Sequence, residues 1–124
     1  MAKILVAEDD REIRELIIFT LRFAGYEMLA AVDGEECYLF AKQHHPDLIL
    51  MDARMPKMNG YEACRLLKGD KATASIPVVF LTAHGLDYEV KAGLEAGCDD
   101  YIIKPISPDK LTEKVKLYLQ KWRK

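Results

Sequence analysis

The sequence lacks any long apolar segment: none of its 124 residues belongs to a stretch that approaches the roughly 20 apolar residues of a membrane-spanning helix. The run from Ile4 to Ala7 ends at Glu8 and is too short for the apolar core of a signal peptide. Neither charge sign dominates, since 18 Lys and Arg face 20 Asp and Glu, and this balance does not favour nucleic acid or an anionic membrane. We therefore expect a cytoplasmic protein without direct nucleic-acid or membrane contact.

Cysteine is also scarce, and nucleotide-binding patterns are missing. Cys37, Cys64 and Cys98 are odd in number and form no Cys-x-x-Cys pair, so we expect small buried thiols in a reducing compartment. The patterns G-x-x-x-x-G-K-[ST] and G-x-G-x-x-G are absent. His44 and His45 are predicted to lie in a loop.

Five short apolar runs alternate with segments of helical spacing. The runs are Ile4–Ala7, Met28–Val32, Leu48–Met51, Val78–Leu81 and Tyr101–Ile103. Strands that are apolar throughout and alternate with helices are typical of a parallel sheet covered on both faces. We predict one α/β domain over residues 1–124, a doubly wound sheet of five strands with five helices.

Helix starts are predicted at four capping residues, Asp10, Asp33, Asn59 and Ser107. The first helix has its apolar stripe at Ile13, Leu16, Ile17, Thr20, Leu21 and Ala24. The fourth helix is less regular, because Gly93 interrupts a stripe formed by Leu86, Val90 and Leu94.

The candidate functional residues all stand at predicted carboxyl ends of strands: Glu8 and Asp9, Asp52, Thr82 and Lys104. Ligand sites of open parallel sheets lie at this edge, where the strand order reverses. If the order is 2-1-3-4-5, the acids converge on Asp52. Crowded carboxylates repel one another unless a cation compensates, and oxygen ligands suit Mg²⁺.

An Asp beside Mg²⁺, with a hydroxyl and an ammonium facing it, is equipped to accept a phosphoryl group. Taken singly, these residues have simpler roles. An Asp often caps a helix or forms a turn, a Thr suits a strand, and a Lys is usually solvated. Their shared position at strand ends favours one site.

Four motifs, ILVAEDD, LILMDARMPKMNG, VVFLTA and YIIKPIS, occur in this order across essentially the whole chain. In sequence and spacing the chain resembles the receiver domain of bacterial two-component response regulators, whose chemotaxis member has a flavodoxin-like sheet of order 2-1-3-4-5. The resemblance implies a phosphoacceptor that assists its own phosphorylation and dephosphorylation and is not otherwise an enzyme.

The resemblance also implies residue roles. Glu8, where many relatives carry Asp, and Asp9 would hold Mg²⁺ together with Asp52 and the backbone carbonyl of Arg54. Asp52 would be phosphorylated. Thr82 and Lys104 would bind the phosphoryl oxygens, and the peptide bond from Lys104 to Pro105 would be cis.

A switch is implied as well. Thr82 would move toward the phosphoryl group and Tyr101 would turn inward, which would alter the surface of the fourth helix, fifth strand and fifth helix. The implied partners are a sensor histidine kinase or histidine phosphotransfer protein and a downstream protein target. The protein would be a monomer or a phosphorylation-dependent dimer. A stand-alone receiver is expected if the chain is complete, and a receiver excised from a longer regulator remains open.

Three alternatives are less favoured. A Mg²⁺-dependent phosphatase with an Asp nucleophile usually carries a second acid two residues later, where this chain has Arg54. A flavin module would need a phosphate cradle where Glu8 and Asp9 stand. A degenerate receiver that acts only as a scaffold would lack a motif residue. The resemblance implies that Arg54 and His84 flank the path of the attacking water, and we hypothesise that cationic Arg54 prolongs the life of the phosphoryl group.

Overall fold

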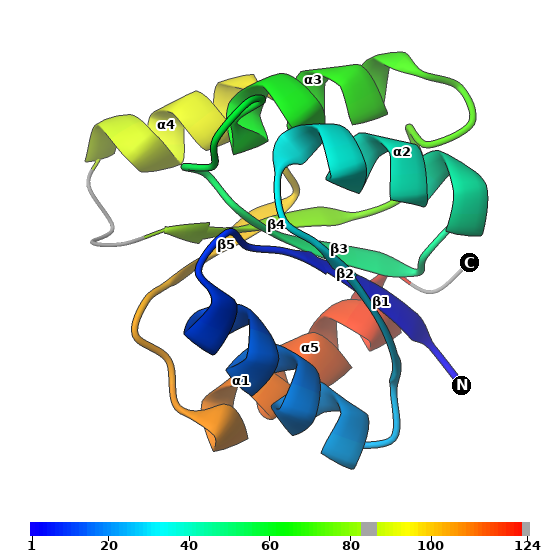
Figure 1. The fold of residues 1–124 in the computed structure, drawn as a ribbon, viewed down its shortest axis with the longest axis vertical. Coiled ribbons are helices and arrows are strands. Elements are labelled where there is room, and N and C mark those ends of the chain that lie inside the picture. Colours follow the sequence, from blue (N-terminus) through cyan, green and yellow to red (C-terminus); the bar gives the residue numbers. More distant parts are fainter. Residues whose placement is uncertain (83–86, 123–124) are drawn as a thin grey trace.

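Strands and helices alternate along the chain in the computed structural model, which describes residues 1–82 and 87–122 (Figure 1). The strands are β1 (Lys3–Ala7), β2 (Glu27–Ala31), β3 (Leu48–Asp52), β4 (Val78–Thr82) and β5 (Asp100–Ile103). The helices are α1 (Arg11–Phe23), α2 (Gly34–His44), α3 (Gly60–Gly69), α4 (Asp87–Glu95) and α5 (Pro108–Lys121). All strand pairs are parallel, and the sheet order β2-β1-β3-β4-β5 confirms the predicted flavodoxin-like fold.

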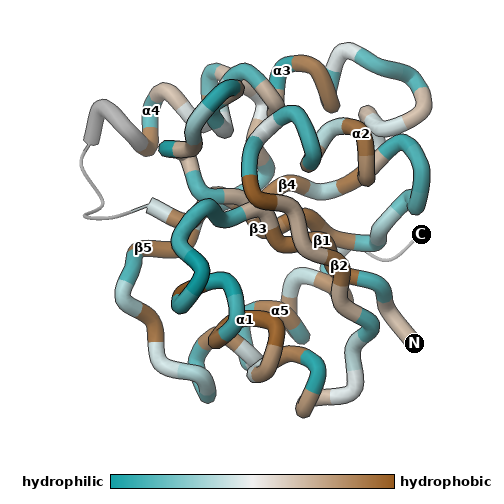
Figure 2. The backbone as a smooth tube through the Cα atoms, in the orientation of Figure 1, coloured by the Kyte–Doolittle hydropathy of each residue, from teal (hydrophilic) through white to brown (hydrophobic). Residues whose placement is uncertain are grey.

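The sheet lies between two helical layers. Helices α2, α3 and α4 cover one face, and α1 and α5 cover the other (Figure 1). The apolar strands form the brown centre of the molecule in Figure 2. Because successive strand side chains point to opposite faces, Leu5 and Met51 belong to the core under α2 and α3, whereas Ile4 and Leu50 belong to the core over α1 and α5.

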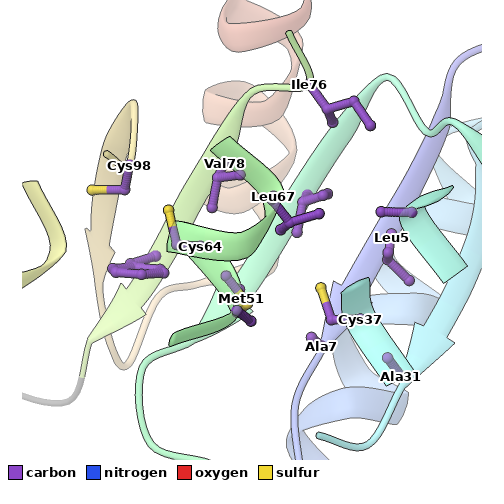
Figure 3. Packing of buried hydrophobic residues seen from close by; sticks show 14 of the residues in the cluster. Leu5, Ala7, Ala31, Cys37, Met51, Cys64, Leu67, Ile76, Val78 and Cys98 are labelled. Atoms are coloured by element: carbon purple, nitrogen blue, oxygen red, sulfur yellow. The ribbon is translucent and has the colours of Figure 1, made fainter. Parts of the chain in front are cut away.

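The three cysteines lie in the core under α2 and α3, where Figure 3 shows them among aliphatic side chains. Cys37, Cys64 and Cys98 are buried and free. Burial raises the pKa of the Cys37 and Cys64 thiols to about 12, so they stay protonated. The prediction that they act as small apolar core residues is confirmed.

The predicted capping residues begin their helices. Asp10 accepts a hydrogen bond from the backbone N–H of Ile13 at 3.1 Å, and Asn59 forms a reciprocal capping box with Glu62. Ser107 caps α5, whose first residue is proline. Within the described ranges no helix is long and apolar enough to cross a membrane.

Three local predictions were wrong. In α1 Leu16 is 55% exposed, and in α4 Leu94 is 52% exposed, so neither belongs to a buried stripe. Gly93 contacts the sheet instead, because a Cβ there would lie 2.6 Å from the ring of Phe80. His44 is the last residue of α2, not a loop residue. Leu86 and His84 lie outside the described residues.

Candidate functional site

Strand register brings the predicted residues to one edge of the sheet. Asp52 at the end of β3 pairs with Leu81 of β4, and Thr82 pairs with Ile103 of β5. Glu8 directly follows β1, whose last residue pairs with the residue before Asp52. The ends of β1, β3, β4 and β5 therefore face the same space, at the point where the strand order reverses.

Three carboxylates form a compact group at this edge. Glu8, Asp9 and Asp52 each offer an oxygen, and the three oxygens lie within 4.8 Å of one another. Glu8 is 1% exposed, Asp52 is half-buried and Asp9 is exposed. Backbone donors hold two of them, since the N–H of Asp10 bonds to Glu8 Oε2 at 3.2 Å and that of Arg54 bonds to Asp52 Oδ1 at 3.3 Å.

Lys104 places its ammonium between two of these acids. Its Nζ donates to Glu8 Oε1 at 2.8 Å and lies 3.6 Å from Asp52 Oδ2. The Lys104–Pro105 peptide bond that follows β5 is cis. One cation therefore bridges the buried acid of β1 and the acid of β3.

The charges of the site perturb one another. Burial raises the pKa of Glu8, and the neighbouring Asp52 raises it further against the opposing effect of Lys104. Burial also raises the pKa of Asp9, to which the nearby Glu8 adds. Burial alone would lower the pKa of Lys104, but its hydrogen bond to Glu8 and the charge of Asp52 raise it, so this side chain stays an ammonium.

A buried hydroxyl without a hydrogen-bond partner completes the edge. Thr82 is 1% exposed, and its Oγ1 has no partner among the residues that the structure describes. A buried polar group without a partner is costly and calls for an explanation, such as an absent ligand oxygen. Tyr101, on the neighbouring strand, is partly buried and packs against the core under α2 and α3.

Two glycines allow close backbone contacts near the site, Gly60 with the end of β3 and Gly34 with the loop that follows it, and no sequence pattern indicated either contact. A Cβ on Gly60 would lie 2.5 Å from the carbonyl oxygen of Asp52, and a Cβ on Gly34 would lie 2.3 Å from that of Met58. Both glycines are first in their helices, directly after the caps Asp33 and Asn59. The Asp-Gly and Asn-Gly pairs were the available signal, but they predict only helix starts and not this close backbone approach.

The donor set fits a hard divalent cation. Three carboxylate oxygens within 4.8 Å would repel strongly, and a single Lys104 ammonium does not balance three acids. Mg²⁺ prefers oxygen ligands and usually keeps coordination positions for water and phosphate oxygens. The exposed Asp9 side chain leaves the solvent side of the site open to these ligands. At this edge of the sheet, acids suited to a divalent cation therefore lie beside an ammonium and a hydroxyl suited to an anion.

The fold and this edge define an α/β protein of the doubly wound, flavodoxin-like class with an acidic site at its switch point. More narrowly, the chain belongs to the response regulator receiver domain family, whose model matches residues 4–116. Receiver domains are the phosphoacceptor switches of two-component signalling, bind Mg²⁺ at an acidic pocket and interact with histidine kinases.

Curated relatives are longer proteins. The chain is 42% identical over 118 residues to the phosphate regulon transcriptional regulatory protein PhoB of Pseudomonas aeruginosa, a match that covers 95% of this chain and 52% of the relative. It is 38% identical over 121 residues to the DNA-binding dual master transcriptional regulator RpaA of Synechocystis, covering 98% and 50%. The chain thus spans about half the length of these regulators.

Two solved structures of receiver domains match over nearly their whole length. The chemotaxis response regulator CheY4 of Vibrio cholerae has a TM-score of 0.89 at 30% identity, covering 94% of this chain and 98% of that one. The receiver domain of the sensor histidine kinase PA1611 from Pseudomonas aeruginosa has a TM-score of 0.87 at 32% identity, covering 98% and 96%. That structure is described with a magnesium ion coordinated in its active-site cleft.

Proposed function

We propose that Asp52 is the phosphoacceptor of this receiver domain and that residues 1–124 act as one switch unit. The observation that carries this assignment is the convergence on Asp52. Its carboxylate belongs to the group of three acids within 4.8 Å, and the Lys104 ammonium lies 3.6 Å from its Oδ2. A carboxylate that attacks phosphorus needs such charged neighbours, because the catalysis of phosphoryl transfer consists mostly of positioning and charge neutralisation.

In the reaction, an Asp52 oxygen forms a bond to phosphorus as the bond from phosphorus to the donor breaks. The donor is a phosphohistidine of a sensor kinase or phosphotransfer protein, whose imidazole leaves with a proton from the surroundings, or a small acyl phosphate. Lys104 is positioned to pair with a phosphoryl oxygen on Asp52. Thr82 supplies the hydroxyl that no described residue engages, and it would donate to a second oxygen.

Glu8, Asp9 and Asp52 would hold Mg²⁺, with the backbone carbonyl of Arg54 as a further ligand. When bound, the ion offsets the crowded negative charge and polarises the phosphoryl oxygens. Glu8 contributes in another way as well. Its carboxylate accepts a hydrogen bond of 2.8 Å from Lys104 Nζ. This bond holds the Lys104 ammonium beside Asp52 before a phosphoryl group is present.

The signal would leave through the surface of α4, β5 and α5. Tyr101 of β5, which pairs with Phe80 two residues before Thr82 on the neighbouring strand, is the proposed second switch residue. A hollow of about 480 Å³ on this surface is lined by Tyr101, Ile103, Lys110 and Lys114, among others, and Ile103 is 49% exposed. An apolar side chain bordered by lysines suits docking of a protein target with acidic groups.

The proposed setting is the cytoplasm, where three free thiols persist. The phosphatase alternative is not favoured, because the family match covers residues 4–116 and Arg54 stands where a second acid would be needed. The match to halves of DNA-binding regulators leaves two modes of output, direct docking or control of a linked domain, and the α4–β5–α5 surface serves either.

The assignment is tested by intact mass spectrometry of the protein after incubation with acetyl phosphate. We expect the mass of one phosphoryl group to be added in the presence of Mg²⁺ and not after chelation with EDTA. Peptide mapping should place the group on the segment that contains Asp52. Addition of phosphate without a divalent cation, or on a segment from elsewhere in the chain, would reject the proposal.

Phosphoryl lifetime should depend on Arg54, the exposed cation two residues after Asp52. Replacing Arg54 with Ala removes a charge that can screen the phosphoryl group from water. We expect dephosphorylation about threefold faster, equivalent to less than 1 kcal/mol in barrier. The decay of phosphorylated protein after removal of acetyl phosphate measures this. Lys57→Ala, which removes an exposed cation of the same loop, is the control and should decay at the wild-type rate.

A further inference from the structure

Arg14 of α1 bonds to the backbone of the two acidic residues that follow β1. Its Nη1 donates to the carbonyl oxygen of Glu8 at 2.8 Å and lies 3.4 Å from the carbonyl oxygen of Asp9. The contact spans the β1–α1 turn and joins α1 to two consecutive backbone carbonyl groups. The guanidinium is half-buried there.

This contact matters most for Asp9. The carboxylate of Glu8 is independently held, because Asp10 N–H and Lys104 Nζ both donate to it. The Asp9 side chain is exposed, and it stands beside another acid that repels it. Its place in the group of three acids therefore depends on where the backbone of the turn holds it, and Arg14 bonds to that backbone.

We propose that Arg14 is a positioning residue for the divalent-cation site, which holds the β1–α1 turn so that Glu8 and Asp9 converge on Asp52 before an ion arrives. The inference rests on the proposed function of that site. Metal sites depend on such outer groups, and removal of one commonly weakens binding by about 10- to 100-fold. Arg14 would not touch the ion itself.

Loss of charge and loss of positioning predict opposite changes in Mg²⁺ affinity when Arg14 is replaced. Removal of a positive charge near a cation site strengthens cation binding, because one repulsive interaction is lost. Loss of the two bonds to Glu8 and Asp9 carbonyls weakens binding, because the acids spread before the ion binds. A measured affinity for Mg²⁺ therefore distinguishes the two effects by direction alone.

The experiment is calorimetric titration of the metal-free protein with Mg²⁺, compared among wild type, Arg14→Met, Arg14→Lys and Arg11→Met. Met keeps the length of the side chain and removes the guanidinium. We expect Arg14→Met to bind Mg²⁺ about tenfold more weakly, and Arg14→Lys to lie between it and wild type. Arg11 is the matched control, because its replacement removes the same charge from the same helix, and its guanidinium pairs with Glu15 and not with the β1–α1 turn among the described residues. Arg11→Met should bind Mg²⁺ as tightly as wild type or slightly more tightly.

Equal or tighter binding by Arg14→Met would overturn the inference. Circular dichroism tests whether each variant is folded. If Arg14→Met does not fold, a wild-type affinity for Mg²⁺ in Arg14→Lys would overturn the inference instead. If wild type binds Mg²⁺ and is phosphorylated at Asp52 while the Arg14 variants bind normally, only this inference fails. If wild type does not bind Mg²⁺ at all, the proposed function and this inference fail together.

Discussion

Replacing Asp52 with Asn is expected to abolish phosphorylation, so that acetyl phosphate and Mg²⁺ leave the mass of the variant unchanged. The substitution preserves size and removes the anionic oxygen that attacks phosphorus. It also removes a charge 3.6 Å from Lys104, whose bond to Glu8 remains as a second anchor. The variant should therefore stay folded while it loses acceptor function. Intact mass and thermal unfolding, measured on the same preparation, separate the two properties.

Two matched variants make this result specific. Asp9→Asn removes a proposed metal ligand but leaves the proposed acceptor, so its phosphorylation should be slow at low Mg²⁺ and recover as Mg²⁺ is raised. Asp47→Asn removes an exposed acid at the opposite edge of the sheet, where it accepts from the backbone of Lys3, and should behave as wild type. A phosphoryl group on Asp52→Asn at the wild-type level would eliminate Asp52 as the acceptor.

The geometry of a parallel sheet explains why the site could be predicted from the sequence. Parallel strands deliver whatever follows them to one edge, so the position of Glu8, Asp52 and Lys104 after apolar runs predicted their convergence. The assumed strand order was the step that patterns could not supply, and the resemblance to a known family provided it. The hydrogen bond from Lys104 to Glu8 joins residues 96 apart in the chain, so no local pattern could indicate it.

The wrong prediction for the buried face of α4 has a physical reason. A helix stripe is inferred from large apolar residues, whereas α4 approaches β4 through Gly93, which lets the helix backbone come close to Phe80. Leu94, the larger residue, is left 52% exposed. Close backbone approach requires the absence of a side chain, and hydrophobic periodicity does not register an absence. Gly34 and Gly60 were not singled out for the same reason.

Replacing Gly60 with Ala is expected to destabilise the protein strongly. The new Cβ would lie 2.5 Å from the carbonyl oxygen of Asp52 and 2.9 Å from Cα of Ala53, and both neighbours are backbone atoms of the β3 end. Backbone cannot rotate away, so the start of α3 must shift. We expect a loss of about 3 kcal/mol in the free energy of unfolding, and a thermal midpoint lower by about 10 °C. Urea and thermal unfolding measure both.

Gly69→Ala is the control, because Gly69 is the last residue of the same helix and an added Cβ there meets no atom within 4 Å. The same substitution should be neutral or stabilising by about 0.5 kcal/mol, since Ala restricts the unfolded chain more than Gly. Equal stability of the two variants would contradict the close contact of α3 with β3. Folded Gly60→Ala should also be phosphorylated more slowly than Gly69→Ala, because the backbone that must yield to the methyl group is that of Asp52 itself. Stability of the fold and geometry of the acceptor therefore depend on the same missing side chain.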